Sequence, residues 1–185
     1  VVVTALVVAL ASQLVYAQQV VGLRVGLQSA SRHAAVAFGV VALMLGSTFL
    51  AAWRGRGGLG LGVTTLALTA ASVPLMYAIL VLLDPTRSFA TTVEISPWGT
   101  RCMLIAALVG SFTLGAFVAA LRRAAPVASR ARGAALGAAA GAWAGFAVFV
   151  FCPSSDPQHL LVGHVLPVLA FTMLGALAVA RALRP

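Results

Sequence analysis

Long apolar runs alternate with short polar connectors along the whole chain. A helix needs about 20 apolar residues to cross the hydrocarbon core of a bilayer, and six runs approach or exceed that length without an Asp, Glu, Lys or Arg inside them. Backbone groups in lipid must be satisfied within each segment, so these runs are predicted to be transmembrane helices. The predicted spans are residues 1–19, 34–53, 59–83, 102–121, 133–151 and 160–180.

The composition indicates that lipid, rather than water, is the main solvent of this chain. Hydrophobic residues make up 62% of the 185 residues and charged residues only 8%, whereas soluble domains carry about 25% charged residues. The connectors are too short to form a second, soluble domain. We therefore predict a single domain over residues 1–185, an all-α polytopic membrane helical bundle with about six transmembrane helices.

The charged residues and the sequence motifs argue against several classes of function. The net charge is +9, but its twelve arginines are scattered between apolar runs, so we expect no nucleic-acid partner. The spans lack carboxylates and lysines, which argues against pumps, proton-coupled transporters and channels. No catalytic triad, phosphate-binding glycine loop or Cys-x-x-Cys motif is recognisable. We therefore expect that the protein is not an enzyme.

The arginines predict the orientation of the bundle. With six spans, one side of the membrane receives eight arginines and the opposite side receives four. Arginine is enriched on the cytoplasmic side of membrane proteins. We therefore expect a multi-pass membrane protein, with the eight-arginine side and both termini in the cytoplasm.

The residues of other reactive types all fall on the opposite, outer side of this topology. None of them was used to derive the orientation. Cys102 heads the fourth span and Cys152 ends the fifth. The outer set contains three acidic residues, three histidines and two cysteines: Asp84, Glu94, Asp156, His33, His159, His164, Cys102 and Cys152.

Two kinds of chemistry are open to the residues around the segment FCPSSDPQHLLVGH, residues 151–164. Cys102 and Cys152 lie at the same predicted depth in an oxidising compartment, which favours a redox-active thiol pair. The same cysteines, with His159, His164 and Asp156, are candidate ligands of a soft metal ion such as zinc or copper. The histidines are five residues apart, about 140° around an α-helix. We therefore expect both to bind one ion only if the helix begins after His159. As a third alternative, the cysteines are buried packing residues.

The fifth predicted span carries a glycine every fourth residue. These glycines are Gly133, Gly137, Gly141 and Gly145, within GAALGAAAGAWAG. Small residues at i, i+4 and i+8 form a smooth stripe along a helix, which lets a second helix backbone approach closely. The stripe predicts a tight helix interface, and self-association of two copies is one candidate use of it.

The last three predicted spans resemble a known family. The segments RCMLIAALVGSFTLGAFVAALRRAAP, GAALGAAAGAWAGFAVFVFCPSSDPQHLLVGHVLP and LGALAVARALRP are similar to the negative-regulator-of-sigma-F family. The points of similarity are an Arg-Cys pair opening the fourth span, LRRAAP after it, a glycine-rich fifth span and a Cys-Pro pair closing that span. Many relatives carry an aromatic residue where this chain has His159 or His164.

The resemblance implies a membrane-bound anti-sigma factor with six spans. Such proteins hold an extracytoplasmic-function sigma factor on the cytoplasmic side of the inner membrane, and a cysteine pair is associated with sensing oxidants or metals. Here that pair corresponds to Cys102 and Cys152. The family's sigma-binding segment lies before the first span, and because the chain opens on Val1 we expect such a segment upstream. The alternative function is a periplasm-facing metal- or cofactor-binding subunit of a larger membrane complex.

Overall fold

The computed structural model describes residues 30–53, 61–82, 97–121, 129–152, 156–179 and 181. Every element in this part of the chain is helical, which confirms the all-α prediction. The letter α marks α-helices and η marks π-helical turns. The elements are α2 (Ala30–Ala52), α3 (Val63–Leu82), α4 (Pro97–Leu121), α5 (Ser129–Phe151), α6 (Pro157–Leu160), η2 (Leu161–Val165), α7 (Leu166–Leu174) and η3 (Gly175–Val179).

Three of the described helices are long and apolar enough to cross a membrane. They are Val63–Leu82, Gly99–Leu121 and the continuous helix Pro157–Val179. Large apolar side chains point outward from them, for example Leu68 and Leu108, as a helix in contact with lipid requires. The membrane character of the bundle is therefore supported for three of the six predicted spans.

The other three predicted spans have different outcomes. Residues 1–19 lie outside the described residues. The span predicted at 34–53 is helical within α2, but its described apolar helix, Val36–Ala52, is shorter than a spanning helix. The span predicted at 133–151 is α5, whose alanines, glycines and Arg132 leave it less hydrophobic than its neighbours. The count of six spans is thus a prediction that the structure does not establish.

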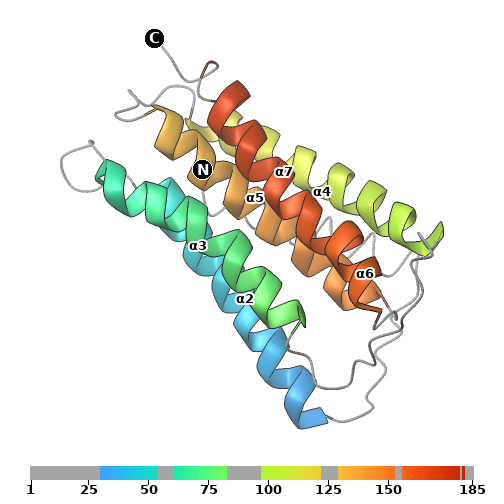
Figure 1. Cartoon of the computed structure of the whole chain (residues 1–185). Helices are drawn as coiled ribbons and strands as arrows, with labels where there is room; N and C mark the ends of the chain where they lie inside the picture. The colour runs from blue at the N-terminus through green and yellow to red at the C-terminus, as the bar shows by residue number, and fades with distance from the viewer. Residues whose placement is uncertain are drawn as a thin grey trace.

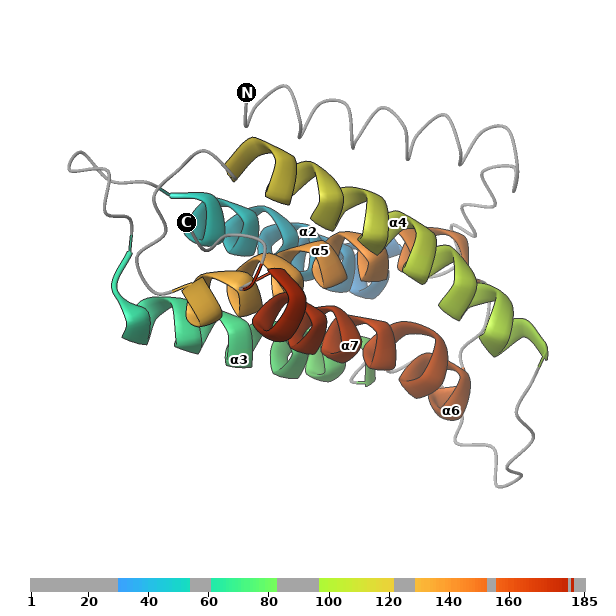
Figure 2. The same cartoon turned by 90° about the horizontal axis from the view of Figure 1, so that it is seen from above.

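Helix α5 lies at the centre of the bundle. It contacts α2, α3, α4 and α7, and the two views show these helices arranged around it (Figures 1 and 2). Its side chains are mostly Ala and Gly, and almost all of those described are buried. Small side chains keep the helix thin, so its neighbours approach on several sides at once.

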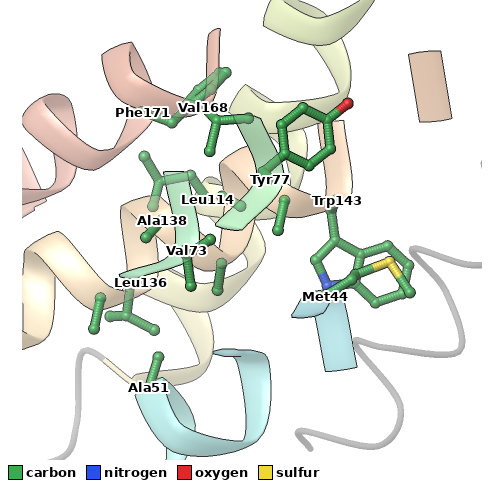
Figure 3. Packing of buried hydrophobic residues seen from close by; sticks show 14 of the residues in the cluster. Met44, Ala51, Val73, Tyr77, Leu114, Leu136, Ala138, Trp143, Val168 and Phe171 are labelled. Carbon is green, nitrogen blue, oxygen red and sulfur yellow. The ribbon is translucent and has the colours of Figure 1, made fainter. Parts of the chain in front are cut away.

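Two buried hydrogen bonds connect α5 to its neighbours α2 and α3. The Trp143 indole Nε1 donates to Thr48 Oγ1 of α2 at 2.9 Å, and the Tyr77 hydroxyl of α3 donates to the Gly145 carbonyl at 2.8 Å. Figure 3 shows Trp143 beside Met44 among the packed apolar side chains. A polar group buried in an apolar interior costs free energy unless it is paired, so these bonds favour one arrangement of α2, α3 and α5.

The glycines of α5 lie against other helices of the same chain. A Cβ atom added to Gly137 would lie 2.0 Å from the Phe171 carbonyl oxygen, and one added to Gly141 would lie 2.8 Å from the Val168 Cα atom. A Cβ atom on Gly175 of η3 would lie 2.1 Å from the carbonyl oxygen of Gly133. Gly145 instead makes room for the Tyr77 ring. The stripe therefore packs within the chain, and self-association remains a prediction.

Candidate functional site

The candidate site lies at the end of the bundle where α4 begins, α5 ends and α6 begins (Figure 1). Cys102 is in the first turns of α4, and Cys152 directly follows α5. His159 is in α6 and His164 in η2. One ligand atom from each of these four residues lies within 4.8 Å of the other three. Three separate segments therefore bring both cysteines and both histidines together.

Asp156 fixes the start of the helix that carries the two histidines. Its carboxylate accepts hydrogen bonds from the backbone N–H groups of Gln158, at 3.4 Å, and His159, at 3.1 Å. Pro157 follows at the first helical position. A backbone N–H at this position has no acceptor within the helix, so its absence in proline costs no hydrogen bond. Asp156 is the N-cap of α6 and is not among the four clustered residues, although it was predicted as a candidate metal ligand.

A π-helical turn explains why both histidines reach the site. The helix begins at Pro157, before His159, and both imidazoles still lie in the cluster, so a helix start after His159 is not needed to bring them together. In η2 the Leu166 N–H donates to the Leu161 carbonyl, five residues back. A turn closed by an i→i+5 bond is wider than an α-turn. It thereby brings positions five residues apart toward the same face, where a regular α-helix would separate them.

The sequence after the turn accounts for its widening. Pro167 has no N–H to donate to the carbonyl of Gly163, and in a regular α-helix its ring would clash with that carbonyl. Gly163 also lies against α4, where an added Cβ atom would be 3.1 Å from the Cys102 Cβ atom. Sequence reasoning missed Gly163 as a site residue. The signal available for it was a glycine next to His164 and four residues before a proline.

The described side chains of the site are close-packed and largely shielded. The Cys152 Sγ atom is 3.0 Å from His159 Nε2. The ring centroids of His159 and His164 are 5.7 Å apart, and their ring planes are inclined at 61° to each other. His159 is 4% exposed and His164 is fully buried. The cysteines are half-buried against a small apolar cluster of Ala106, Ala144 and Val148, and no disulfide joins them. Soft, reactive groups are thus held in an environment that is mostly apolar.

His159 carries a polar atom that the described residues leave unsatisfied. Its Nδ1 atom is buried and has no hydrogen-bond partner in the described part of the chain. The backbone of Gly99 faces it, since a Cβ atom added there would be 3.7 Å from Nδ1. Burying a polar group without a partner costs about 1–3 kcal/mol. The four residues together could hold a metal ion.

Other residues of the predicted outer set lie beyond what the structure describes. Asp84 and Glu94 are in segments outside the described residues, as is the side chain of His33. At the opposite end of the bundle, Arg132 is enclosed within the first turns of α5 and is 2% exposed. Sequence reasoning placed Arg132 in a cytoplasmic connector, because its position one residue before an apolar run gave no sign of burial.

A family model described as negative regulator of sigma F matches residues 1–184, which include the whole candidate site. No curated protein and no solved structure matches the chain.

Proposed function

The chain belongs to the family of negative regulators of sigma F, and from this we propose that it is a membrane-bound anti-sigma factor for an extracytoplasmic-function sigma factor. It acts by holding the sigma factor at the cytoplasmic face of the bacterial inner membrane, and it acts by binding rather than by catalysis. The proposal includes six spans, with both termini in the cytoplasm and no nucleic-acid partner.

The arrangement of the bundle supports this orientation. The end that carries Cys102, Cys152 and the two histidines is opposite the end that carries Arg130 and Arg132, at the start of α5 (Figure 1). Arginines are enriched on the cytoplasmic side, so the reactive end faces the periplasm. An impermeant maleimide should then label the reduced cysteines in intact spheroplasts. Labelling that requires permeabilised membranes would invert the topology.

The sensing element is the pair of thiols contributed by α4 and α5. The observation that carries this proposal is that both thiols belong to one group whose ligand atoms lie within 4.8 Å of one another, and that no disulfide joins them. Hydrogen peroxide reacts with one thiolate and a proton from water to give a sulfenic acid, and it releases one oxygen as water. The second thiol then displaces the other oxygen as water and forms the disulfide. The two thiols lose two electrons, which reduce the peroxide.

The central helix offers a route from this site to the sigma factor. Cys152 directly follows α5, and Arg130 and Arg132 are at the other end of the same helix. A disulfide requires an S–S separation of about 2.05 Å, so its formation draws the outer ends of α4 and α5 together. A preference of about 1–3 kcal/mol for one packing is enough to shift a bistable helix pair. The shift weakens retention of the sigma factor.

A sigma-dependent reporter in cells tests this proposal. Cys102→Ser and Cys152→Ser should each abolish the response to oxidant or metal stress, because one sulfur cannot form the pair. Met103→Leu is the matched control, since it changes a neighbouring sulfur-containing side chain and leaves both thiols in place. A parent-like response in either serine variant would contradict the proposal and make the cysteines packing residues.

A second candidate function is a periplasm-facing metal- or cofactor-binding subunit of a larger membrane complex. The two buried histidines favour it, because a disulfide switch does not require them. Affinity purification of the full-length protein from membranes separates the two. Recovery of a sigma factor supports the anti-sigma role, whereas recovery of other membrane subunits without a sigma factor supports the alternative.

A further inference from the structure

We propose that Cys102, Cys152, His159 and His164 are the four ligands of one divalent thiophilic cation, Zn²⁺. The inference deepens the sensing role proposed above and rests on it, since it names the ligand that the same site takes. It assigns both histidines a direct bond to the metal.

The positions of the ligand atoms suit a tetrahedral ion. Zinc–sulfur bonds are about 2.3 Å and zinc–nitrogen bonds about 2.0–2.1 Å, so neighbouring ligand atoms in a tetrahedral site are ~3.3–3.8 Å apart. The four ligand atoms already lie within 4.8 Å of one another. Side-chain rotations that move them by about 1 Å complete the tetrahedron, so the helices need not separate.

The charge of the filled site also suits its surroundings. Two thiolates balance the two positive charges of Zn²⁺, and two neutral imidazoles complete the set. The filled site is therefore electrically neutral, which lowers the cost of placing it next to the apolar side chains of Ala106, Ala144 and Val148. Monovalent copper in the same ligand set would leave one net negative charge there, so the structure favours Zn²⁺.

Polar ligand groups are costly to bury in an apolar environment, and a bound metal ion offsets part of that cost. His164 is fully buried and His159 is 4% exposed, and the ring nitrogen of His159 that faces the Cys152 Sγ atom, at 3.0 Å, is Nε2. The π turn that carries His164 is a rare backbone form that often marks functional sites. A chain that needed only apolar packing at this place would not require two imidazoles and a distorted helix.

Zinc titration of the purified full-length protein tests the assignment. The protein is kept in detergent with a phosphine reductant, stripped of metal, and titrated with Zn²⁺ against a chromogenic chelator. We expect one Zn²⁺ per chain. His164→Asn and Cys152→Ser should each weaken binding by at least about 100-fold, because each removes a direct ligand. Asp156→Asn is the matched control: it keeps a helix cap, lies outside the four, and should bind Zn²⁺ like the parent.

Cobalt substitution gives a second measurement on the unmodified protein, which avoids any folding defect of a variant. Co²⁺ in the parent should show the visible bands of a tetrahedral ion and a thiolate charge-transfer band. The assignment is overturned by the absence of these bands, by parent-like Zn²⁺ binding in folded His164→Asn, or by equal losses in Asp156→Asn. Binding of Cu⁺ without Zn²⁺ also overturns it. Because none of these measurements involves a sigma factor, the anti-sigma role succeeds or fails separately.

Discussion

The middle of α5 and its outer end are packed in opposite ways. In the middle, Gly137 and Gly141 bring the backbone of α7 so close that not even a methyl group fits between the helices. At the outer end, the helix leads to Cys152, which meets Cys102 and two imidazoles. The middle has no reactive groups and little freedom to adjust, whereas the outer end has buried groups that bind, oxidise or hydrogen-bond.

This difference indicates a division of roles along one helix. Backbones in direct contact allow few alternative arrangements, so the crossing of α5 and α7 is suited to hold the helices in register and to move as a unit. The outer end gains or loses interactions with its chemical state, so it is suited to detect a signal. Each prediction below breaks or sharpens this comparison, and the largest expected effect comes first.

Replacing Gly137 with Ala should cause the largest loss of stability. The added Cβ atom would lie 2.0 Å from the backbone carbonyl of Phe171, which cannot rotate away, so α5 and α7 must separate. We expect a loss of about 3 kcal/mol or more, measured by thermal unfolding in detergent.

Gly115 provides the matched control for that experiment. It is a helical glycine of α4 with nothing within 4 Å of an added Cβ atom. Gly115→Ala should be neutral or stabilise by up to about 1 kcal/mol through helix propensity. Equal effects of the two substitutions would show that the α5–α7 crossing is not tightly constrained.

Replacing Thr48 with Val should have a smaller effect, because it removes one acceptor and preserves the packing. The Trp143 indole N–H would be left buried without its partner, at a cost of about 2 kcal/mol. Thr113 is equally buried, but its hydroxyl donates to the Val109 carbonyl within its own helix. Thr113→Val should therefore change stability by less than about 0.5 kcal/mol. Comparable losses in both variants would mean that the bond between α2 and α5 contributes nothing specific.

Deleting Leu161 should have the smallest effect, although it removes a residue from a helix. A π turn contains one residue more than the α-turn it replaces, and Leu161 is exposed. Its deletion leaves the two histidines four residues apart, on one face of an ordinary α-helix. We expect parent-like zinc affinity and nearly unchanged stability. Loss of zinc binding in a folded deletion variant would show that the π turn itself is required.

The helical bundle is the part of the structure that the sequence predicts well. Hydrophobic runs locate α3 and α4 to within a few residues, because a helix in lipid must be continuously apolar. The glycine repeat predicts a close helix approach, but not its partners, α7 and α3. The identity of a neighbouring helix depends on how the whole bundle folds, and a stripe of small residues is equally compatible with several neighbours.

The candidate site is predicted only in part. Topology brings Cys102 and Cys152 to one end, because α4 and α5 are antiparallel, with Cys102 near the start of α4 and Cys152 just after the end of α5. In a regular α-helix, the five-residue spacing of His159 and His164 would place the two side chains on different faces and would argue against a shared site. The π turn before Pro167 breaks this periodicity. The role of Asp156 as a cap is visible in the sequence only once the helix start at Pro157 is known.

The central claim is that the chemical state of the outer cluster controls retention of a sigma factor at the other end of the bundle. The most direct test measures the sigma factor in the membrane fraction of cells with the full-length protein, before and after a pulse of peroxide. We predict that the parent releases the sigma factor after the pulse, whereas Cys152→Ser holds it unchanged. Retention by the parent, or equal release from both proteins, would contradict the account.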